Sequence, residues 1–374
     1  MKRFFQPIQK DGSSKKPALS PSAKGGEEAA ATAAADPNSA VSGENQKKDP
    51  TKFLTWNANS FLLRIKNNWP EFSQFVESLD PDVIAIQEVR MAAAGPKGAP
   101  KNPREIKDDT NASREEKLII TRALSSLPIK NYDVWWSLSD SKYAGTALLV
   151  KKCFQPKVSF SLDGTGSKHE LDGRVILAEF ETFKLLNTYV PNNGWKEEES
   201  SFPRRRKWDK RMLEFVTQAS SKPLIWCGDL NVSHEEIDVS HPDFFAAAKQ
   251  NGYVPPNKED FGQPGFTLAE RRRFGTILKE GKLVDAYRIL HKDKDVESGF
   301  SWSGNPIGKY RGKRMRIDYF IVSEELKDRI LSCEMHGRGI ELKGFYGSDH
   351  CPVSLELCGT TPNVEQGLSS PKDS

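Results

Sequence analysis

Short runs of β-branched and aromatic residues alternate with helical patterns through most of this chain of 374 residues. The runs predict strands over Phe53–Asn57, Val83–Gln87, Ala147–Lys151, Val175–Phe180, Lys184–Tyr189, Leu224–Cys227, Ile317–Val322 and Val353–Leu357. Helical spacing predicts helices over Trp69–Ser78, Glu115–Ser125, Arg204–Ser220, Leu268–Glu280 and Val284–Leu290. Some strand runs are continuously apolar and others alternate with polar residues, which favours two sheets packed on each other. We therefore predict an α/β fold, a four-layer α/β sandwich with two β-sheets packed face to face and helices on the outer faces.

The two ends of the chain differ in composition from its middle. Residues 1–50 are mostly Ala, Ser, Gly, Pro, Lys and Glu, and they carry too little apolar surface to offset the entropy of ordering. We predict a disordered tail over 1–50, a single folded domain over 51–358, and a second disordered tail over 359–374. The polar stretch 91–116 predicts a surface insertion, because strand patterns continue on both sides of it.

Composition excludes several classes of protein. The 55 basic and 51 acidic residues leave a formal net charge of +4, which is too mild to identify a partner. No apolar run approaches the roughly 20 residues of a membrane span, and the N-terminus lacks the apolar stretch of a signal peptide. The five cysteines are odd in number and form no CxxC pair. This argues against a disulfide scaffold or a zinc ribbon and indicates a reducing compartment.

Polar side chains gather where the apolar strand runs end. The first run leads into Asn57 and Asn59, the second into Gln87 and Glu88, and the GDLN run into Asp229 and Asn231, while Asp349 and His350 precede the last strand. Strand ends can present such groups rigidly at a sheet rim. Any single acidic residue there is more often a turn or a helix cap, but the whole set favours a site. Asp229 and Asn231 point the same way if their backbone is extended.

Oxygen donors dominate this set, without a cluster of cysteines or histidines. Such donors suit Mg²⁺ or Mn²⁺ rather than zinc. Asp318 lies inside an apolar strand run, where an unpaired carboxylate is costly. A hydrogen bond that fixes the tautomer and orientation of His350 explains it economically. An ion pair with Arg314 or Arg316 is the alternative.

Basic residues form three groups. They are Arg204–Lys207 with Lys210 and Arg211, Arg271–Arg273, and Lys309–Arg316. The first two groups lie on predicted helices, where solvated faces are their ordinary explanation. The third lies in a glycine-containing loop that leads to Asp318. We predict that Arg311, Arg314 and Arg316 of this loop grip a phosphate backbone.

Seven motifs, taken in order, resemble those of the exonuclease III-type apurinic/apyrimidinic (AP) endonucleases within the endonuclease/exonuclease/phosphatase family. They are TWNAN, AIQEVR, NTYVPN, CGDLNVSHEEID, GFTLAERRRF, RIDYFIVS and GSDHCPV, and the resemblance covers about Lys52 to Leu357. CGDLNVSHEEID followed by GFTLAERRRF is typical of the AP-endonuclease branch. The lipid and inositol phosphatase branches share mainly the GDxN and SDH elements.

The resemblance implies a catalytic set of Tyr189, Asp229, Asn231, Asp318 and His350. Asp229 would orient or deprotonate the attacking water, and Asn231 would hydrogen-bond that water or the phosphoryl oxygens. His350, oriented by Asp318, would bind the scissile phosphate. Tyr189 would contact the phosphate or help the leaving oxygen.

The same resemblance implies a cation, Mg²⁺ or Mn²⁺, with Glu88 as its principal ligand. The implied metal set is Asn57, Glu88, Asp229, Asn231, Asp349 and His350. The implied substrate-binding residues are Asn192 and Trp302, joined by Arg311, Arg314 and Arg316. A hard cation with an imidazole and amide donors meets the needs of phosphodiester cleavage: an in-line water, neutralised oxygens and a stabilised leaving alkoxide.

The implied function is a Mg²⁺-dependent DNA repair endonuclease. It would cut 5′ to an abasic site, leaving a 3′-hydroxyl and a 5′-deoxyribose phosphate, and would also clean blocked 3′ ends. Its partner would be double-stranded DNA with abasic sites or blocked 3′ ends, read mainly through phosphates and shape. The alternatives are a phosphatase or lipid phosphodiesterase of the same fold, and a DNA-binding relative that has lost catalysis.

The remaining expectations concern the cellular setting. We expect a monomer without membrane attachment, located in the nucleus, with an organelle as the alternative. Met1–Lys10, which contains Phe4 and Phe5 among basic residues, is a candidate docking segment for a repair protein.

Three positions depart from the family pattern. Asn59 stands where some members carry Asp, which leaves a second metal site open. Met315 stands where some members place Trp, and Ser301 stands where some place Phe before the Trp at position 302. These positions line the implied pocket for the abasic sugar, so lesion selectivity and 3′-end activity are open to change. The 91–116 insertion is longer than the family pattern.

Overall fold

The computed structural model describes residues 49–96, 98–163, 170–194, 202–218, 220–247, 254–255, 257–292, 299–337 and 342–359. All of these lie in one compact unit that spans residues 47–374. The strands of its first sheet are β1 (Lys52–Asn57), β2 (Val83–Gln87), β5 (Tyr132–Ser137), β6 (Thr146–Lys151), β15 (Ile330–Met335) and β16 (Val353–Leu357). Those of its second sheet are β7 (Lys157–Ser159), β8 (Val175–Glu179), β9 (Lys184–Tyr189), β10 (Leu224–Asp229), β11 (Leu283–Asp285) and β14 (Asp318–Ser323).

Two short strand pairs and a set of helices complete the described elements. The pairs are β3 (Ala93–Ala94) with β4 (Asn102–Ile106), and β12 (Trp302–Ser303) with β13 (Arg314–Met315). The α-helices are α1 (Phe61–Leu79), α2 (Asn111–Leu124), α3 (Phe202–Thr217), α4 (Pro242–Ala246), α5 (Leu268–Glu280) and α6 (Ala286–Leu290). The 3₁₀ turns are Ile129–Asn131, Leu171–Gly173, Glu236–Asp238, Lys258–Asp260, Glu324–Arg329 and Lys343–Phe345.

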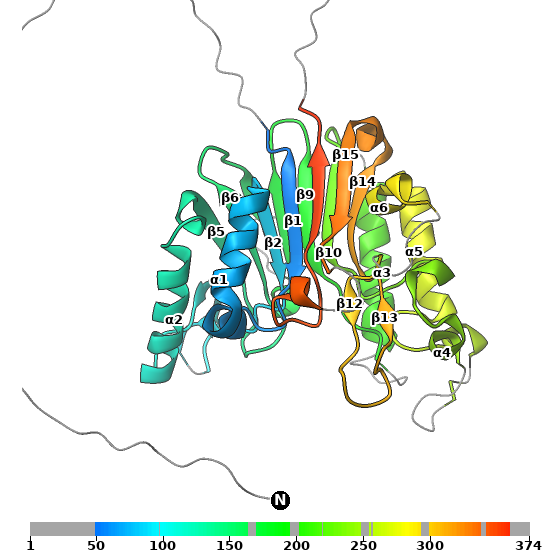
Figure 1. The fold of residues 1–374 in the computed structure, drawn as a ribbon, viewed down its shortest axis with the longest axis horizontal. Coiled ribbons are helices and arrows are strands. Elements are labelled where there is room, and N and C mark those ends of the chain that lie inside the picture. Colours follow the sequence, from blue (N-terminus) through cyan, green and yellow to red (C-terminus); the bar gives the residue numbers. More distant parts are fainter. Residues whose placement is uncertain are drawn as a thin grey trace, which may run out of the picture. The chain divides into compact units, whose positions relative to one another are not determined.

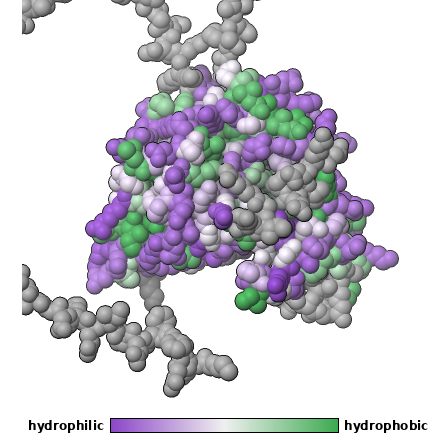
Figure 2. All heavy atoms as spheres, in the orientation of Figure 1, coloured by the Kyte–Doolittle hydropathy of each residue, from purple (hydrophilic) through white to green (hydrophobic). Residues whose placement is uncertain are grey.

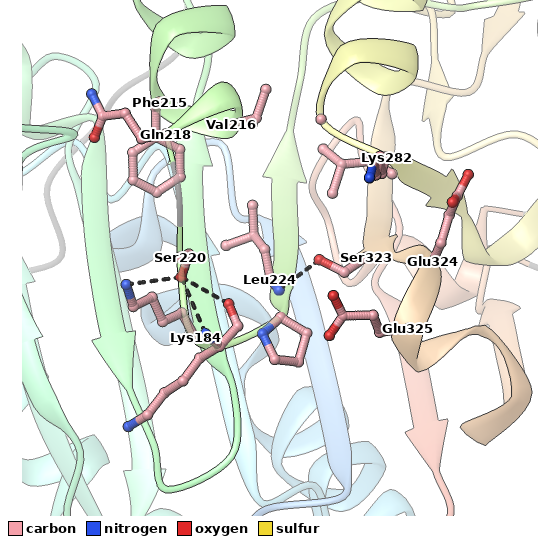
Figure 3. A pocket seen from close by; sticks show the side chains of 14 residues that line it. Lys184, Phe215, Val216, Gln218, Ser220, Leu224, Lys282, Ser323, Glu324 and Glu325 are labelled. Carbon is pink, nitrogen blue, oxygen red and sulfur yellow. Dashed lines mark hydrogen bonds between the residues drawn. The ribbon is translucent and has the colours of Figure 1, made fainter.

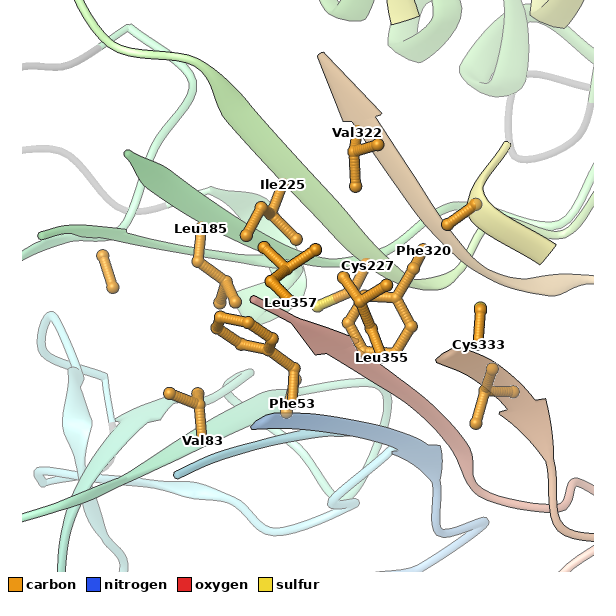
Figure 4. Close-up of a cluster of buried hydrophobic side chains, with 14 of the residues drawn as sticks. Phe53, Val83, Leu185, Ile225, Cys227, Phe320, Val322, Cys333, Leu355 and Leu357 are labelled. Atoms are coloured by element: carbon orange, nitrogen blue, oxygen red, sulfur yellow. The ribbon is translucent and has the colours of Figure 1, made fainter. Parts of the chain in front are cut away.

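The two large sheets pack face to face. Their strand orders are β15-β16-β1-β2-β6-β5 and β11-β14-β10-β9-β8-β7. Apolar side chains from both sheets point toward one another between them (Figure 4), with Phe53 and Val83 from the first sheet and Leu185, Ile225 and Phe320 from the second. Burial of this apolar surface is the main force that holds the sheets together.

Helices cover the outer faces of the two sheets (Figure 1). The outer face of the first sheet packs against α1 through Phe61 and Phe72, and against α2 through Ile120. The outer face of the second sheet packs against α3 through Met212 and against α5 through Phe274. The order helix, sheet, sheet, helix confirms the predicted four-layer α/β sandwich.

Strand register places the polar strand ends at one rim of the sandwich. In the first sheet β1 and β2 run parallel, with Asn57 opposite Gln87. In the second sheet Asp229 at the end of β10 lies opposite Tyr189 of β9 on one side and Asp318 of β14 on the other. Residues from five strands that are far apart in the sequence therefore meet at this rim.

Several predicted boundaries differ from the structure. The first helix begins at Phe61 rather than Trp69 and contains Pro70, which the surrounding aromatic packing tolerates. The predicted helix Val284–Leu290 is a short strand followed by α6. The strand ends and the helix begins at Asp285, which caps α6: its side chain accepts hydrogen bonds from the backbone N–H groups of Tyr287 and Arg288.

The predicted insertion and tails have different outcomes. The stretch 91–116 contains β3, β4 and the start of α2, and Met91 and Ala93 within it are buried. The predicted tails over 1–50 and 359–374, with the docking segment Met1–Lys10, lie outside the described residues except at 49, 50 and 359. Asp49 caps the β8–β9 turn by accepting hydrogen bonds from the N–H groups of Glu181 and Thr182.

The face of the molecule shown in Figure 2 is mainly hydrophilic, and the cysteines form no disulfide, as expected from the composition. Hydrophobic residues occur on this face in smaller separate groups. The five cysteines are all free. None of the described helices combines the length and the apolar character needed to cross a bilayer.

Candidate active site

Most of the predicted catalytic and metal residues line a single pocket. The pocket has a volume of about 290 Å³ and lies where β9 and β10 end and β14 begins. Its lining includes Glu88, Tyr189, Asn192, Asp229, Asn231, Trp302, Met315, Asp349 and His350. Asn57 and Asp318 are fully buried and contact these residues from behind.

His350 is held between two carboxylates. Its Nδ1 lies 2.7 Å from Oδ2 of Asp318, and its Nε2 lies 3.9 Å from Oδ2 of Asp229. Burial lowers the pKa of His350, but the negative charge of Asp318, with smaller contributions from Asp229 and Asp349, raises it to about 10. The imidazole is therefore protonated at neutral pH, and its Nε2–H faces the pocket. The predicted pairing of Asp318 with His350 is confirmed, and Arg316, one of the two alternative partners, pairs with Asp238 and Asp285 instead.

Asp229 is oriented by amide donors. Nδ2 of Asn57 donates to its Oδ2 at 2.9 Å, and the backbone N–H of Asn231 donates to its Oδ1 at 2.9 Å. Asn231 has a φ of 47°, so the condition of an extended backbone, under which these two side chains would point the same way, is not met. Burial raises the pKa of Asp229 to about 7, and the attraction of His350 opposes this shift. A carboxylate with that pKa is suited to accept a proton near neutral pH.

Asn57 and Asn231 act as hydrogen-bond donors toward the carboxylates. The Nδ2 group of Asn57 bridges Asp229 and Glu88, and its Oδ1 accepts from the N–H of Asn59. Nδ2 of Asn231 donates to Asp229 and to the carbonyl of Val190. Oδ1 of Asn231 accepts from Nδ2 of Asn192 at 3.0 Å. Each amide oxygen accepts one hydrogen bond and keeps a second lone pair, so the assignment of Asn57 and Asn231 as metal ligands stays a prediction.

Glu88 and Asp349 fit a hard cation best among the predicted ligands. Oδ1 of Asp349 accepts from Nδ2 of Asn59 at 2.7 Å, and its Oδ2 accepts from Nε1 of Trp302 at 3.2 Å. Glu88 accepts from Asn57 and Arg90. Each carboxylate oxygen has two lone pairs, so these oxygens can bind a cation while keeping those donors.

Asp229, Asp318 and His350 form a second cluster of possible ligand atoms. Among the described residues, they bring ligand atoms within 4.8 Å of one another. An imidazole protonated on both nitrogens has no lone pair for a metal, and its single positive charge offsets one of the two carboxylate charges. Asp229 keeps carboxylate lone pairs, so its assignment as a metal ligand stays a prediction, as does that of His350, which would first have to lose its Nε2 proton.

Backbone strain collects at the same rim. Asn59, Glu88 and Asn231 adopt φ values of 42°, 48° and 47°. Glu88 directly follows β2, and Asn59 and Asn231 lie two residues after the ends of β1 and β10. Left-handed conformations are unfavourable for residues other than glycine and cluster at functional sites. Sequence patterns carried no signal for this strain.

Tyr189 is buried at the pocket wall and stays protonated. Burial raises its pKa well above the ordinary value, and the nearby charges of Glu88 and Asp229 add to the effect. The guanidinium of Arg174 lies 4.7 Å from the centre of the Tyr189 ring, and its Nη1 donates to the Tyr189 carbonyl at 3.0 Å. Tyr189 can therefore donate a hydrogen bond into the pocket. Arg174 and Arg90 escaped the sequence analysis because neither belongs to a polar strand end or a basic run.

The walls of the pocket combine aromatic and apolar groups. Trp302 and Tyr310 meet edge to face with ring centres 5.7 Å apart, and Met315 lies beside them. Arg311 is exposed on the loop that joins β12 to β13, and Arg314 is the partly exposed first residue of β13. Neither arginine lines the pocket, so their predicted contact with a phosphate backbone lies outside it.

Arg316 is a structural residue, and its predicted role in substrate binding is not supported. It is 1% exposed and forms ion pairs of 2.8 Å with Asp238 and 2.7 Å with Asp285. Asp238 also pairs with Arg288. The side chain of Arg316 is thus turned into the protein, although its neighbours in sequence reach the pocket.

This buried cluster predicts a loss of stability in acid. Burial raises the pKa of Asp238, but Arg316 and Arg288 outweigh burial and lower it. A lowered pKa stabilises the fold above the unfolded-state value of 3.8, and the stabilisation is lost as pH falls through the folded-state pKa. We expect the difference in unfolding free energy between wild type and Asp238→Asn to shrink below about pH 4. Urea titrations at several pH values measure it, and a difference that grows in acid would contradict the assignment.

A larger pocket lies at the opposite end of the second sheet. It has a volume of about 420 Å³ and lies beside the first residues of β9 and β10 and the last residue of β14. Figure 3 shows lysine and glutamate side chains around Leu224 and Phe215. It contains none of the polar strand ends, its charges are mixed, and we place the chemistry in the smaller pocket.

Comparison with known proteins agrees with this geometry. Residues 54–350 match the endonuclease/exonuclease/phosphatase family. An Arabidopsis thaliana protein named DNA-(apurinic or apyrimidinic site) endonuclease is 70% identical over 373 residues, covering 99% of this chain and 100% of that protein. A Plasmodium berghei protein of the same name is 38% identical over 352 residues, covering 84% of this chain and 64% of that protein. The crystal structure of an AP endonuclease from Leishmania major superposes with a TM-score of 0.60 at 23% identity, covering 82% of this chain and 87% of that chain.

Proposed function

The chain belongs to the endonuclease/exonuclease/phosphatase family, and from this membership we propose that it is a DNA repair endonuclease that hydrolyses the phosphodiester 5′ to an abasic site. The products are a 3′-hydroxyl and a 5′-deoxyribose phosphate. The observation that carries the proposal is the cationic His350, held between Asp318 and Asp229 in a pocket walled by Trp302 and Met315. In this pocket the positive charge of His350 can bind a phosphate, and the side chains of Trp302 and Met315 can contact a sugar that lacks its base.

The side chains divide the work of hydrolysis. Asp229 orients the attacking water and accepts its proton as the new P–O bond forms, and amide donors fix its position. The imidazolium of His350 neutralises charge that develops on the phosphoryl oxygens. The hydroxyl of Tyr189 donates a hydrogen bond to a phosphoryl oxygen or to the departing 3′ oxygen. Asn192, bonded to Asn231, supports the phosphate position.

We assign the cation site to Glu88 and Asp349. Proteins of this family depend on divalent metals, and oxygen donors of this kind suit Mg²⁺ or Mn²⁺. When bound there, the cation would neutralise phosphate charge and favour departure of the 3′ oxygen. Asn59 contributes a neutral amide to Asp349, and this favours one cation rather than two.

Cation binding can be observed without measuring activity. The indole of Trp302 donates to Asp349, so a cation at Asp349 alters the surroundings of that ring. We expect Mg²⁺ to change the tryptophan fluorescence of wild type, and we expect Trp302→Phe to lose that change. Asp349→Asn should raise the Mg²⁺ concentration for half the change by roughly 10-fold or more. Glu325→Gln, in the opposite pocket, is the matched control and should behave as wild type. An unchanged midpoint for Asp349→Asn would move the cation away from this residue.

A substrate panel tests the proposed function against its alternatives. The panel contains a duplex with one abasic-site analogue, a nicked duplex with a 3′-phosphate, and a phosphoinositide. We expect incision of the abasic duplex together with removal of the 3′-phosphate. Removal of the 3′-phosphate alone would point to Met315 in the pocket wall as the cause of altered selectivity. Ser301, which the sequence analysis also placed in this pocket, is fully buried and does not line it. Turnover of the phosphoinositide alone would replace the proposal with the phosphatase reading.

The cellular setting follows from the proposed substrate. We propose that the protein acts as a monomer on double-stranded DNA with abasic sites or blocked 3′ ends, in the nucleus or in an organelle that holds DNA. Met1–Lys10 is the proposed docking segment for a repair protein. A pull-down with and without these ten residues, together with imaging of a tagged chain, tests both proposals.

A further inference from the structure

A second, basic pocket borders the active site on the far side of Tyr189. It has a volume of about 130 Å³ and is lined by Glu170, Arg174, Pro191, Arg204, Lys207, Trp208 and Arg211. Positions 204, 207 and 211 are three and four residues apart, so they share one face of α3. The basic group that begins at Arg204, which the sequence analysis explained as a solvated helix face, therefore lines a pocket with one of its faces.

Arg174 connects this pocket to the active site. Arg174 is only 2% exposed, and its guanidinium contacts both the ring and the backbone carbonyl of Tyr189. Nη2 of Arg174 donates to the hydroxyl of Tyr143 at 2.9 Å. Its Nε has no hydrogen-bond partner among the described residues, and the nearest carboxylate oxygen, Oδ2 of Asp172, lies 3.5 Å away. This Nε is buried on the side of Asp172, while the Arg174 side chain forms part of the pocket wall.

The charges of the pocket leave an excess of cations. Arg204 pairs with Asp172, and Arg211 pairs with Glu170 and Asp163. Lys207 is exposed and has no ion pair within the described part of the chain. Arg204 and Lys207 also lie in the first two turns of α3, where the helix dipole is positive. The site favours an anion with several acceptor oxygens.

We propose that this pocket is a second phosphate subsite, which takes a backbone phosphate of the DNA strand flanking the scissile bond. The inference rests on the proposed function. DNA held with one phosphate at His350 carries further phosphates along the same rim, and Arg174 places this pocket beside that path. The two parallel N–H donors of a guanidinium match the spacing of phosphate oxygens. Lys207 adds a positive charge that no carboxylate of a described residue neutralises, whereas Arg204 and Arg211 form ion pairs with carboxylates.

Two lysines of α3 provide the test. Lys207→Ala removes the cation that has no ion pair, and Lys210→Ala removes an exposed lysine of the same helix that lies outside the pocket and 3.9 Å from Glu214. The full chain is titrated with a labelled abasic duplex in EDTA across a range of salt concentrations. We expect Lys207→Ala to reduce the slope of log K against log [salt] by about 1. Lys210→Ala should keep the slope of wild type.

The outcomes separate this inference from the proposed function and from other sources of phosphate. Equal slopes for Lys207→Ala, Lys210→Ala and wild type, with normal incision by wild type, would overturn the subsite alone. A second arm adds inorganic phosphate to the binding assay. If Lys207→Ala lost sensitivity to inorganic phosphate while its slope with DNA stayed unchanged, the pocket would bind a free anion and the DNA assignment would be wrong. The binding slopes test the subsite even if wild type fails to incise.

Discussion

Asp229→Asn is expected to lower kcat for incision of an abasic duplex by about 1,000-fold, because the asparagine cannot accept the proton of the attacking water. The substitution keeps the size of the side chain. Asn57 and the backbone N–H of Asn231 still surround it, although one amide donor then faces another. Single-turnover incision measures the chemical step, and fluorescence anisotropy measures binding of the same duplex. We expect binding to change little.

The matched control for this variant is Asp133→Asn, an exposed aspartate on β5. It should retain the rate of wild type. If Asp229→Asn kept its activity and its DNA binding, the pocket would not be the place of catalysis. A wild type that binds the duplex and does not incise it would instead support the alternative of a DNA-binding relative that has lost catalysis.

Arg316→Met is expected to lower the free energy of unfolding by about 3–5 kcal/mol, because it leaves buried carboxylates without their cation. Asp238 is fully buried, and Arg288 alone would remain beside it. Urea denaturation measures the change. Arg316→Lys is the companion variant in case Arg316→Met does not fold. It keeps the charge but loses the fork, and it should fall between wild type and Arg316→Met.

Arg311→Ala is the contrasting variant from the same loop. Arg311 is exposed, so its loss should leave stability within about 0.5 kcal/mol of wild type. It should weaken DNA binding if Arg311 grips a phosphate. The opposite pattern, with stability unchanged in Arg316→Met and DNA binding weakened, would restore the role in substrate binding that the sequence predicted for Arg316.

Local patterns predicted the elements that depend on local forces. The bounds of β2, β9, β16 and α5 agree residue for residue with the predicted runs, since strong apolar patterns and capping residues define them. Thr267 caps α5 through a capping box with Glu270. β5 and β15 were missed, because Trp135 and Trp136 of β5 are only half-buried and β15 is an edge strand with Leu331 exposed.

A contact in the site could be predicted from the sequence only where one residue requires a partner of a particular kind. A carboxylate inside an apolar strand demands a partner, so the pairing of Asp318 with His350 could be inferred across 32 positions. The partners of Arg316 could not be inferred, because Asp238 and Asp285 carry no pattern that links them to it. The orientation of the amides of Asn57 and Asn231 depends on which carboxylates surround them in space. The contact of Arg174 with Tyr189 depends on the packing of two strands that are antiparallel neighbours.

One gel tests the central claim most directly. Wild type is incubated with a duplex that carries a single labelled abasic-site analogue, with Mg²⁺ or with EDTA, and the ends of the product are identified. The account predicts a cut 5′ to the lesion in Mg²⁺, with a 3′-hydroxyl on one fragment and a 5′-deoxyribose phosphate on the other, and no cut in EDTA. An intact duplex in both lanes, across low salt concentrations, would contradict it.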